Sequence, residues 1–509
     1  MSAVAIDRFT VRYRTPPGDV RAQPRLQRIV LAAVEHMLDG ALDRAGVGRE
    51  EIVCIRDLRS VVRLRLREPD SMLTTAFGEA LAREIAAAAR RSSASTVIYR
   101  SRTHAIIDFA IAAASGDASR AWAWNQIGIW HDAHPTSSDA MARAVMRALI
   151  DEPRNAIAVL AYLARTHKNA FVALMDRAGA DAWIELARAA AASAGAPASW
   201  LDERSSPGER EPLSESEWLD RPTAAERVRR LVARCVRASA IARASLDRIG
   251  LGGGEPLEML SSGVARRLTA VAVLSILEVE PACVSATTDR LSLALAAAER
   301  ELCALASNAG RPLHDHADDA AERQTIGSRD VSGDRSADEE DEGRLAASTQ
   351  FGGVLFFLNV AAAVELPTLL ENDLRLEGRG VRWTLHQLAL LLGGDPFDAA
   401  VLAFAGLPPH QSPPSIQQPP ADDAELFALH EHRRTLLHAV RERLGGRDNP
   451  DEALTRFVCA RRASIVADPG WIEMHLPADE VSIEIRRGGL DRDPGWVPWL
   501  GVVVRFRYV

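Results

Sequence analysis

The strongest fold signal in the chain is the stretch SDAMARAVMRALIDEPRNAIAVLAYLART, residues 138–166. The stretch is rich in alanine, which has the highest helix propensity. The leucine, isoleucine and valine residues of the stretch recur at helical spacing. The stretch therefore predicts two helices with buried faces, separated at Pro153. The same pattern is found at about 103–115, 168–176, 180–194, 224–249, 257–277, 289–305, 351–365, 384–392 and 424–444. We expect a mostly α protein.

The two ends of the chain show a different period. Apolar residues alternate with polar ones at 9–13, 62–66, 471–476, 481–485 and 502–508, which is typical of half-buried strands. Helical patterns at 25–42 and 73–85 lie among the N-terminal strands. Because each set of strands is small, pairing them would cover exposed edges. The expected fold class is mostly α with small α+β terminal regions, a helical middle, and both sets of strands in one sheet.

Composition divides the chain into seven segments. Residues 195–222 are polar with several prolines, and 307–348 are acidic with almost no large apolar side chains. The second segment cannot bury enough surface to offset the entropy of ordering it. The predicted organisation is a strand-helix-strand-helix domain (1–100), a helical region (101–194), a linker (195–222), a helical region (223–306), a disordered acidic linker (307–348), a helical region with a proline-rich connector at 408–420 (349–446), and a C-terminal strand region (447–509).

Composition also excludes several classes of protein. The net charge of the 509 residues is −8, whereas nucleic-acid binders normally carry a basic excess. Lys168 is the single lysine, and no glycine-rich loop precedes it. Walker-type phosphate loops, kinase phosphate clamps and Schiff-base enzymes all need a placed lysine. We expect no nucleic acid among the partners, and a small-molecule ligand is not expected.

Cysteine spacing and hydropathy bear on the compartment. The five cysteines are far apart and form no C-x-x-C pair, so each is interpreted as a small buried residue. No signal peptide is seen at the N-terminus. The longest apolar stretch, Phe351 to Val364, is shorter than the roughly 20 residues of a membrane helix and predicts a buried core helix. We expect a cytoplasmic protein with no membrane span.

Three motifs resemble cofactor or metal sites. His314-Asp315-His316 offers ligand atoms but lies in the acidic segment, which favours a solvated loop. His430-Glu431-His432 lacks the second histidine of a zinc-protease helix, since position 434 is arginine, and predicts surface residues. Gly250 to Gly254 follows a helix rather than a strand and predicts a helix end. We predict no catalytic residue, cofactor or metal.

Two groups of residues are candidates for binding a partner. Arg63, Arg65 and Arg67 alternate with apolar residues and would form a cationic strand face, which binds an anion or an acidic partner surface or is simply solvated. Trp496 and Trp499 lie just before the last predicted strand. A third aromatic group, Trp122, Trp124 and Trp130, is interpreted as a core or interface anchor rather than a ligand platform.

The termini resemble those of the tape-measure proteins of bacterial contractile injection systems, the phage-tail-like particles. The similar residues are Ile6-Asp7-Arg8-Phe9-Thr10-Val11, Ile55-Arg56-Asp57-Leu58 leading into Val61-Val62-Arg63-Leu64, the pair Phe77 and Leu81, the helical stretch from Val145 to Leu186, and Pro498-Trp499-Leu500 before the last strand. These motifs cover about a third of the chain and are mainly apolar patterns.

The resemblance implies a structural role rather than a reaction. The expected function is that of a non-enzymatic, tape-measure-like assembly protein that helps to set or template the inner tube, with inner-tube, baseplate or cap proteins as partners. One alternative is a cytoplasmic helical interaction scaffold unrelated to such particles. The other is an enzyme of unknown class.

Overall fold

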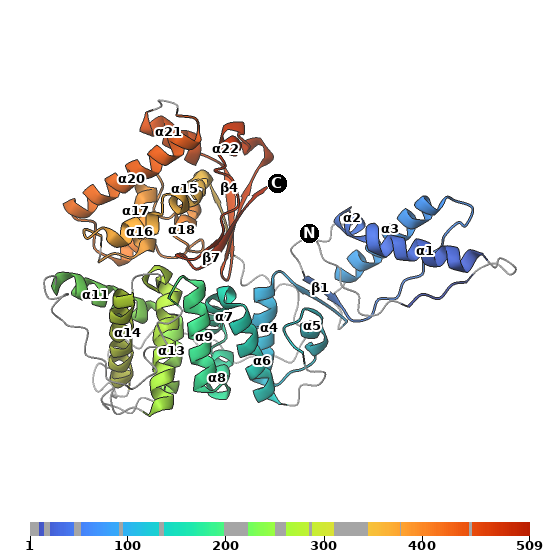
Figure 1. The fold of residues 1–509 in the computed structure, drawn as a ribbon, viewed down its shortest axis with the longest axis horizontal. Helices are drawn as coiled ribbons and strands as arrows, with labels where there is room; N and C mark the ends of the chain where they lie inside the picture. The colour runs from blue at the N-terminus through green and yellow to red at the C-terminus, as the bar shows by residue number, and fades with distance from the viewer. Residues whose placement is uncertain are drawn as a thin grey trace, which may run out of the picture. The chain divides into compact units, whose positions relative to one another are not determined.

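The computed structural model describes residues 10–14, 21–44, 52–90, 95–131, 137–197, 222–249, 261–284, 288–309, 345–376, 378–446 and 450–509. Helices predominate, and the described strands form two small sheets (Figure 1). This confirms the mostly α class with α+β ends. The chain divides into two compact units, residues 1–145 and 146–509, which are described separately.

Unit 1 contains α1 (Ala22–His36), α2 (Leu38–Arg44), β1 (Ile52–Ile55), α3 (Asp70–Ala89), β2 (Thr96–Tyr99), α4 (Arg102–Ser115), α5 (Ala121–Gln126) and the start of α6 (Ser138–Asp151). The helix predicted at 25–42 is divided between α1 and α2, and the one predicted at 73–85 is α3. Val30, Leu38, Phe77 and Leu81 are buried together where these helices meet.

The two predicted N-terminal strands are not strands. Residues 10–14 and 57–65 have no regular secondary structure, and Phe9 lies outside the described residues. Their period of two is nevertheless real, because Val11, Tyr13, Val62 and Leu64 pack against the core of α1, α2 and α3. Packing against helices therefore satisfies the alternation without a sheet. The strands of this unit are instead β1 and β2, which pair antiparallel with Ile52 opposite Tyr99.

The aromatic group of unit 1 is part of its interior. Trp124 and Trp130 are 1% and 2% exposed, and their ring centroids lie 4.7 and 5.4 Å from that of Phe109. The indole nitrogen of Trp124 donates to Asp108 at 3.1 Å. The interpretation as a core anchor is confirmed for these two residues, whereas Trp122 is half-buried.

The first part of unit 2 is a layer of helices (Figure 1). Its elements are α7 (Pro153–Thr166), α8 (Lys168–Arg177), α9 (Ala180–Ser193), α11 (Pro222–Ala238), α12 (Ala240–Ser245), η1 (Leu246–Arg248), α13 (Ser262–Val279), η3 (Pro281–Val284) and α14 (Thr288–Ala309). The alanine-rich helices pack closely, α13 against α9 and α11 against α14. Small side chains allow this approach, and the buried leucines and valines fill the space between them.

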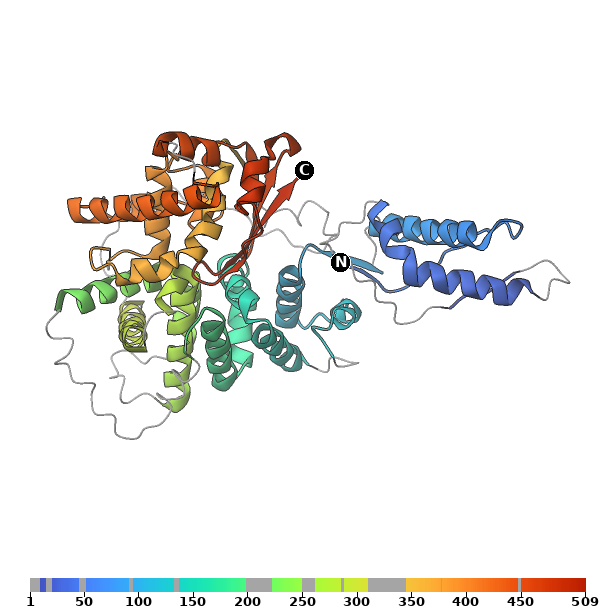
Figure 2. The ribbon, with the colours of Figure 1, turned by 45° about the horizontal axis from the view of Figure 1, so that its top comes forward.

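The second part of unit 2 is a five-stranded sheet covered by helices. Its strands are β3 (Leu345–Thr349), β4 (Ala463–Asp468), β5 (Trp471–Leu476), β6 (Gly495–Val497) and β7 (Val502–Tyr508), in the order β3-β4-β5-β7-β6. Figure 2 shows helices on one side of these strands. They are η5 (Gly352–Phe356), α15 (Phe357–Ala363), α16 (Leu366–Asn372), α17 (Val381–Leu391), α18 (Ala399–Phe404), α19 (Pro414–Gln417), α20 (Asp423–Arg443) and α21 (Asp451–Cys459).

The strand periods at the C-terminus predict the buried face of this sheet. Ile472, Met474, Val504 and Phe506 point into one core with the helices of residues 352–459. β5 lies between β4, antiparallel, and β7, parallel. The prediction of one sheet shared by both ends of the chain is therefore wrong: in the described residues, β1 and β2 pair only with each other, and β3 supplies an edge of the C-terminal sheet.

Two further predictions need correction. Residues 481–485 are not a strand: η6 (Ala478–Glu480) and α22 (Ile483–Arg487) occupy this region, and the Ser482 hydroxyl accepts from the amide of Ile485 as an N-cap. The acidic segment predicted at 307–348 is too long at both ends, since α14 continues to Ala309 and β3 begins at Leu345. Its remainder lies outside the described residues, as does most of the 195–222 linker.

Two buried glutamates hold helices of unit 2 in place, one within the helical layer and one between the two parts of the unit. Glu278 of α13 accepts from the amides of Ala240 and Ile241 at the start of α12, at 3.2 and 3.0 Å. Glu280 accepts from the amide of Val381 at the start of α17, at 3.1 Å. Carboxylates at helix N-termini satisfy otherwise unpaired amides and interact favourably with the helix dipole. α13 and its C-terminal extension thus fix the position of α17 relative to the helical layer.

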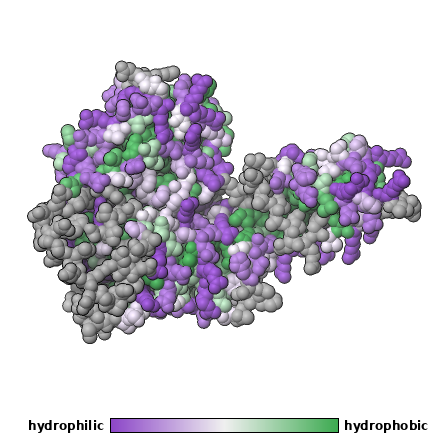
Figure 3. Space-filling model, in the orientation of Figure 1, coloured by the Kyte–Doolittle hydropathy of each residue, from purple (hydrophilic) through white to green (hydrophobic). Residues whose placement is uncertain are grey.

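None of the described helices combines the length and the apolar character that crossing a membrane requires. Hydrophilic residues predominate on the face drawn in Figure 3, where apolar residues form small separate groups.

Candidate functional site: two arginine clusters

The predicted arginine row is exposed as the alternation implies. Arg63, Arg65 and Arg67 are exposed, whereas Val62, Leu64 and Leu66 between them are half-buried. None of the three guanidinium groups forms an ion pair with a described residue. Three like charges in five residues repel one another, so an acidic surface placed against them would relieve this repulsion. We call these three residues the arginine row.

The predicted tryptophans are used within the chain. The indole nitrogen of Trp496 donates to the carbonyl of Ser193 at 3.3 Å, and Arg154 lies 5.9 Å from its ring centroid. Trp499 is half-buried and packs against the core of the C-terminal sheet. Both side chains therefore contribute to packing in unit 2, whereas the arginine row belongs to unit 1.

The histidines at 430–432 divide in two. His430 is exposed, as predicted, but His432 is 8% exposed and its Nε2 lies 3.0 Å from Asp373 Oδ2. The pKa of Asp373 is lowered, first by the hydrogen bond from Arg375 and also by that from His432. The helix turn that exposes His430 directs His432 inward, so the contact between His432 and Asp373 is structural. No group of three potential metal ligands gathers among the described residues.

Cysteine burial follows the prediction. Cys54, Cys235, Cys283 and Cys459 are buried, and Cys303 is half-buried. Burial raises the pKa of the Cys54 thiol to about 11 and that of Cys235 well above its ordinary value. These thiols stay protonated near neutral pH, so they are unsuited to nucleophilic chemistry.

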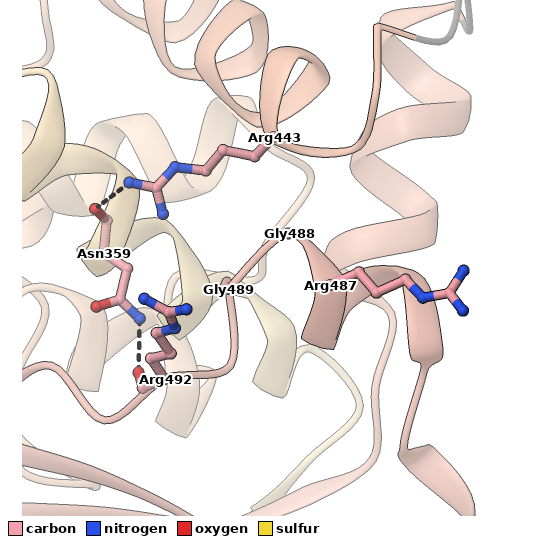
Figure 4. Close-up of a pocket in the computed structure, with 6 residues that line it drawn as sticks. All are labelled: Asn359, Arg443, Arg487, Gly488, Gly489 and Arg492. Atoms are coloured by element: carbon pink, nitrogen blue, oxygen red, sulfur yellow. Dashed lines mark hydrogen bonds between the residues drawn. The ribbon is translucent and has the colours of Figure 1, made fainter.

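A second arginine cluster was missed by the sequence analysis. Asn359, Arg443, Arg487, Gly488, Gly489 and Arg492 line a surface pocket of about 300 Å³ in unit 2 (Figure 4). We call it the arginine pocket. Arg443 is the last residue of α20 and Arg487 the last of α22, while Arg492 lies in the loop before β6. The only local signal is the run Arg-Arg-Gly-Gly at 486–489, because residues 359 and 443 are distant in sequence.

Asn359 holds the pocket together. Its Nδ2 donates to the backbone carbonyls of Leu490 and Arg492, at 3.0 and 2.7 Å, and its own backbone carbonyl accepts from Arg443 Nη2 at 3.3 Å. Figure 4 shows the guanidinium groups of Arg443 and Arg492 on the Asn359 side, whereas that of Arg487 points away from them. None of the three arginines forms an ion pair within the described part of the chain.

The two glycines permit the loop to run where it does. A Cβ at Gly488 would lie 3.0 Å from the carbonyl oxygen of Arg443, so a larger residue would force the loop or the end of α20 to shift. Gly489 has φ +65°, and a Cβ there would lie 3.1 Å from Arg492 Nε. Left-handed backbone favours glycine. The two glycines therefore let the loop place Arg492 beside the end of α20.

Comparison of the chain with protein-family models, with curated proteins and with solved structures gave no match. Assignment of a function therefore rests on the residues and the geometry above.

Proposed function

We propose that this chain is a non-catalytic assembly protein of a bacterial contractile injection particle, tape-measure-like, that binds inner-tube, baseplate or cap proteins in the cytoplasm. The observation that carries the proposal is the arginine row of unit 1, a cationic surface on the segment that resembles the ends of tape-measure proteins. The proposal would make this unit the docking module.

The residues behind the resemblance also form the core of unit 1. Phe77 and Leu81 are 8% and 7% exposed, and Val62 and Leu64 pack against the same cluster. Because this apolar pattern specifies the core of unit 1, its resemblance to the ends of tape-measure proteins supports a similar fold of this unit. The polar residues on its surface are then free to specify the partner, which for the arginine row would be acidic.

The packing of unit 2 favours action in a folded form. Its longest described helix, α14, has 22 residues, which corresponds to about 33 Å. The helices lie side by side and share buried contacts, so extending them along a tube would expose their core. We therefore favour a role at the baseplate or cap over direct measurement of tube length.

A helical interaction scaffold outside such particles is the second candidate. It too uses the arginine row, and it differs only in the identity of the acidic partner. Co-purification from the native cell separates the two, because tube, baseplate or cap proteins should be recovered only under the first proposal.

The decisive experiment combines a gene deletion with a surface variant. Deletion should abolish or deregulate particle assembly, as seen by electron microscopy. Arg63→Gln/Arg65→Gln/Arg67→Gln should reduce co-purification of particle proteins while circular dichroism stays unchanged. The matched control is Arg28→Gln/Arg83→Gln/Arg90→Gln, which removes the same charge from exposed positions on α1, α3 and the end of α3. Normal particles in both the deletion and the row variant would overturn the proposal.

A further inference from the structure

The arginine pocket has the features of an anion site. Two guanidinium groups from different elements, those of Arg443 and Arg492, lie on the Asn359 side of a pocket of about 300 Å³. We propose that this pocket binds a phosphate-type oxyanion, either inorganic phosphate or the phosphate group of a small phosphomonoester, with Arg443 and Arg492 as its ligands. This inference is independent of the proposed particle role.

Charge is the first argument. The chain has a net charge of −8 and acidic side chains compensate many of its arginines, as in the pairs Arg486–Asp491 and Arg441–Asp451. The arginines of the pocket have no such partner among the described residues. Placing two or three like charges around one concavity raises the local positive potential and attracts an anion.

Preorganisation is the second argument. The side-chain amide of Asn359 donates to the backbone carbonyls of residues 490 and 492 and so fixes the loop, and the backbone carbonyl of Asn359 accepts from Arg443. The backbone around Arg492 is therefore fixed before any ligand arrives, which lowers the entropy cost of binding. Gly488 and Gly489 allow the loop to approach α20 so closely.

The chemistry of the donors favours phosphate over a carboxylate. Guanidinium groups donate to carboxylate and phosphate oxygens, often in bidentate pairs. A carboxylate presents two oxygens in one plane, whereas a phosphate group directs oxygens to several sides and carries close to two charges. Arginines that arrive from the end of α20 and from the 488–494 loop match the second arrangement better.

The structural alternative is that the arginines only complement helix ends. Arg443 and Arg487 close α20 and α22, where cations interact favourably with the helix dipole. Arg492, however, belongs to no helix, and Arg443 donates to α15 rather than to its own last turn. The alternative predicts no phosphate binding, so the two are separable by titration.

The test is isothermal titration of the full-length protein with inorganic phosphate at constant ionic strength. Saturable one-to-one binding is expected. Arg443→Gln and Arg492→Gln should each weaken it by about tenfold or more, because each removes one charged ligand. Arg487→Gln should change it by no more than about threefold, since its guanidinium points away. The matched control Arg456→Gln, at an exposed position of α21 outside the pocket lining, should leave it unchanged.

A second series identifies the ligand source. Glycerol 3-phosphate binding more tightly than inorganic phosphate would assign the pocket to a phosphomonoester, and the reverse order would assign it to free phosphate. Acetate in the same buffer should bind more weakly than either. Absence of saturable phosphate binding, equal weakening by Arg456→Gln and Arg443→Gln, or tighter binding of acetate would each overturn the proposal. Unchanged circular dichroism spectra establish that the variants are folded.

Discussion

At the scale of single residues, the contact between Gly380 and Glu280 leaves no room for a side chain at position 380. A Cβ at Gly380 would lie 2.1 Å from Glu280 Oε2, which is far inside van der Waals contact. We predict that Gly380→Ala lowers the free energy of unfolding by about 1–3 kcal/mol, the usual cost of overpacking a buried site. Urea denaturation measures it. Gly378→Ala is the control, since its Cβ would make only ordinary contacts with Arg227, and an equal loss there would contradict the explanation.

Glu280 itself should make stability depend on pH. Burial raises its pKa to about 7 from an ordinary value of 4.5, against a smaller opposing effect of Arg382. Because the folded state holds the proton more tightly than the unfolded state, the stabilisation by protonated Glu280 is present at low pH and is lost as pH rises from about 4.5 to 7.

Replacement by glutamine isolates this effect. Glu280→Gln keeps an oxygen that accepts from Val381 but cannot ionise. We predict that the melting temperature of the variant, minus that of the natural protein, increases between pH 5 and pH 8, by differential scanning fluorimetry. A difference that decreases over this range would mean that attraction to Arg382 outweighs the cost of burial.

At the scale of elements, β3 shows where the acidic segment must end. Residues 345–349 pair with 463–467 of β4, and the Thr349 hydroxyl donates to Asp398, the N-cap of α18, at 2.8 Å. This strand carries one edge of the C-terminal sheet and ties it to a helix. A deletion that includes it removes structure, whatever the composition of the preceding residues.

Two nested deletions test this boundary. Replacing residues 312–342 with a short Gly-Ser linker removes almost no large apolar side chains, so we predict a melting temperature within a few degrees of the natural value. Replacing 312–349 also removes β3, and we expect a fall of about 10 °C or more, or loss of folding. Equal melting temperatures for the two deletions would show that β3 contributes little.

At the scale of the whole molecule, the chain has two units with separate cores. Phe77 is buried in unit 1, and Phe404 is buried in unit 2. Since Phe77 and Phe404 belong to different hydrophobic clusters, we predict two unfolding transitions in differential scanning calorimetry. Phe77→Ala should lower the transition temperature of only one of them, with a loss of about 3–5 kcal/mol in the free energy of unfolding. Phe404→Ala should lower only the other. A single transition lowered by both substitutions would mean that the units unfold together.

The sequence alone was enough to predict most helices and the strands at 471–476 and 502–508. These predictions depend on periodicity, which reports how residues of one element face a core, and that information is local. It was also enough for the exposed arginine row, because alternation placed Arg63, Arg65 and Arg67 opposite the half-buried valine and leucines.

Only the tertiary structure decided what each alternating segment packs against. Val11, Tyr13, Val62 and Leu64 lie in segments with the period of strands, but they pack against α1, α2 and α3 without pairing into a sheet. β7 has the same period and pairs with β5 and β6. The arginine pocket depends equally on long-range contacts, since Asn359 joins residues 443, 490 and 492 from distant parts of the chain. Local patterns specify which side chains need a buried face or a partner, and only the folded chain determines which surfaces provide them.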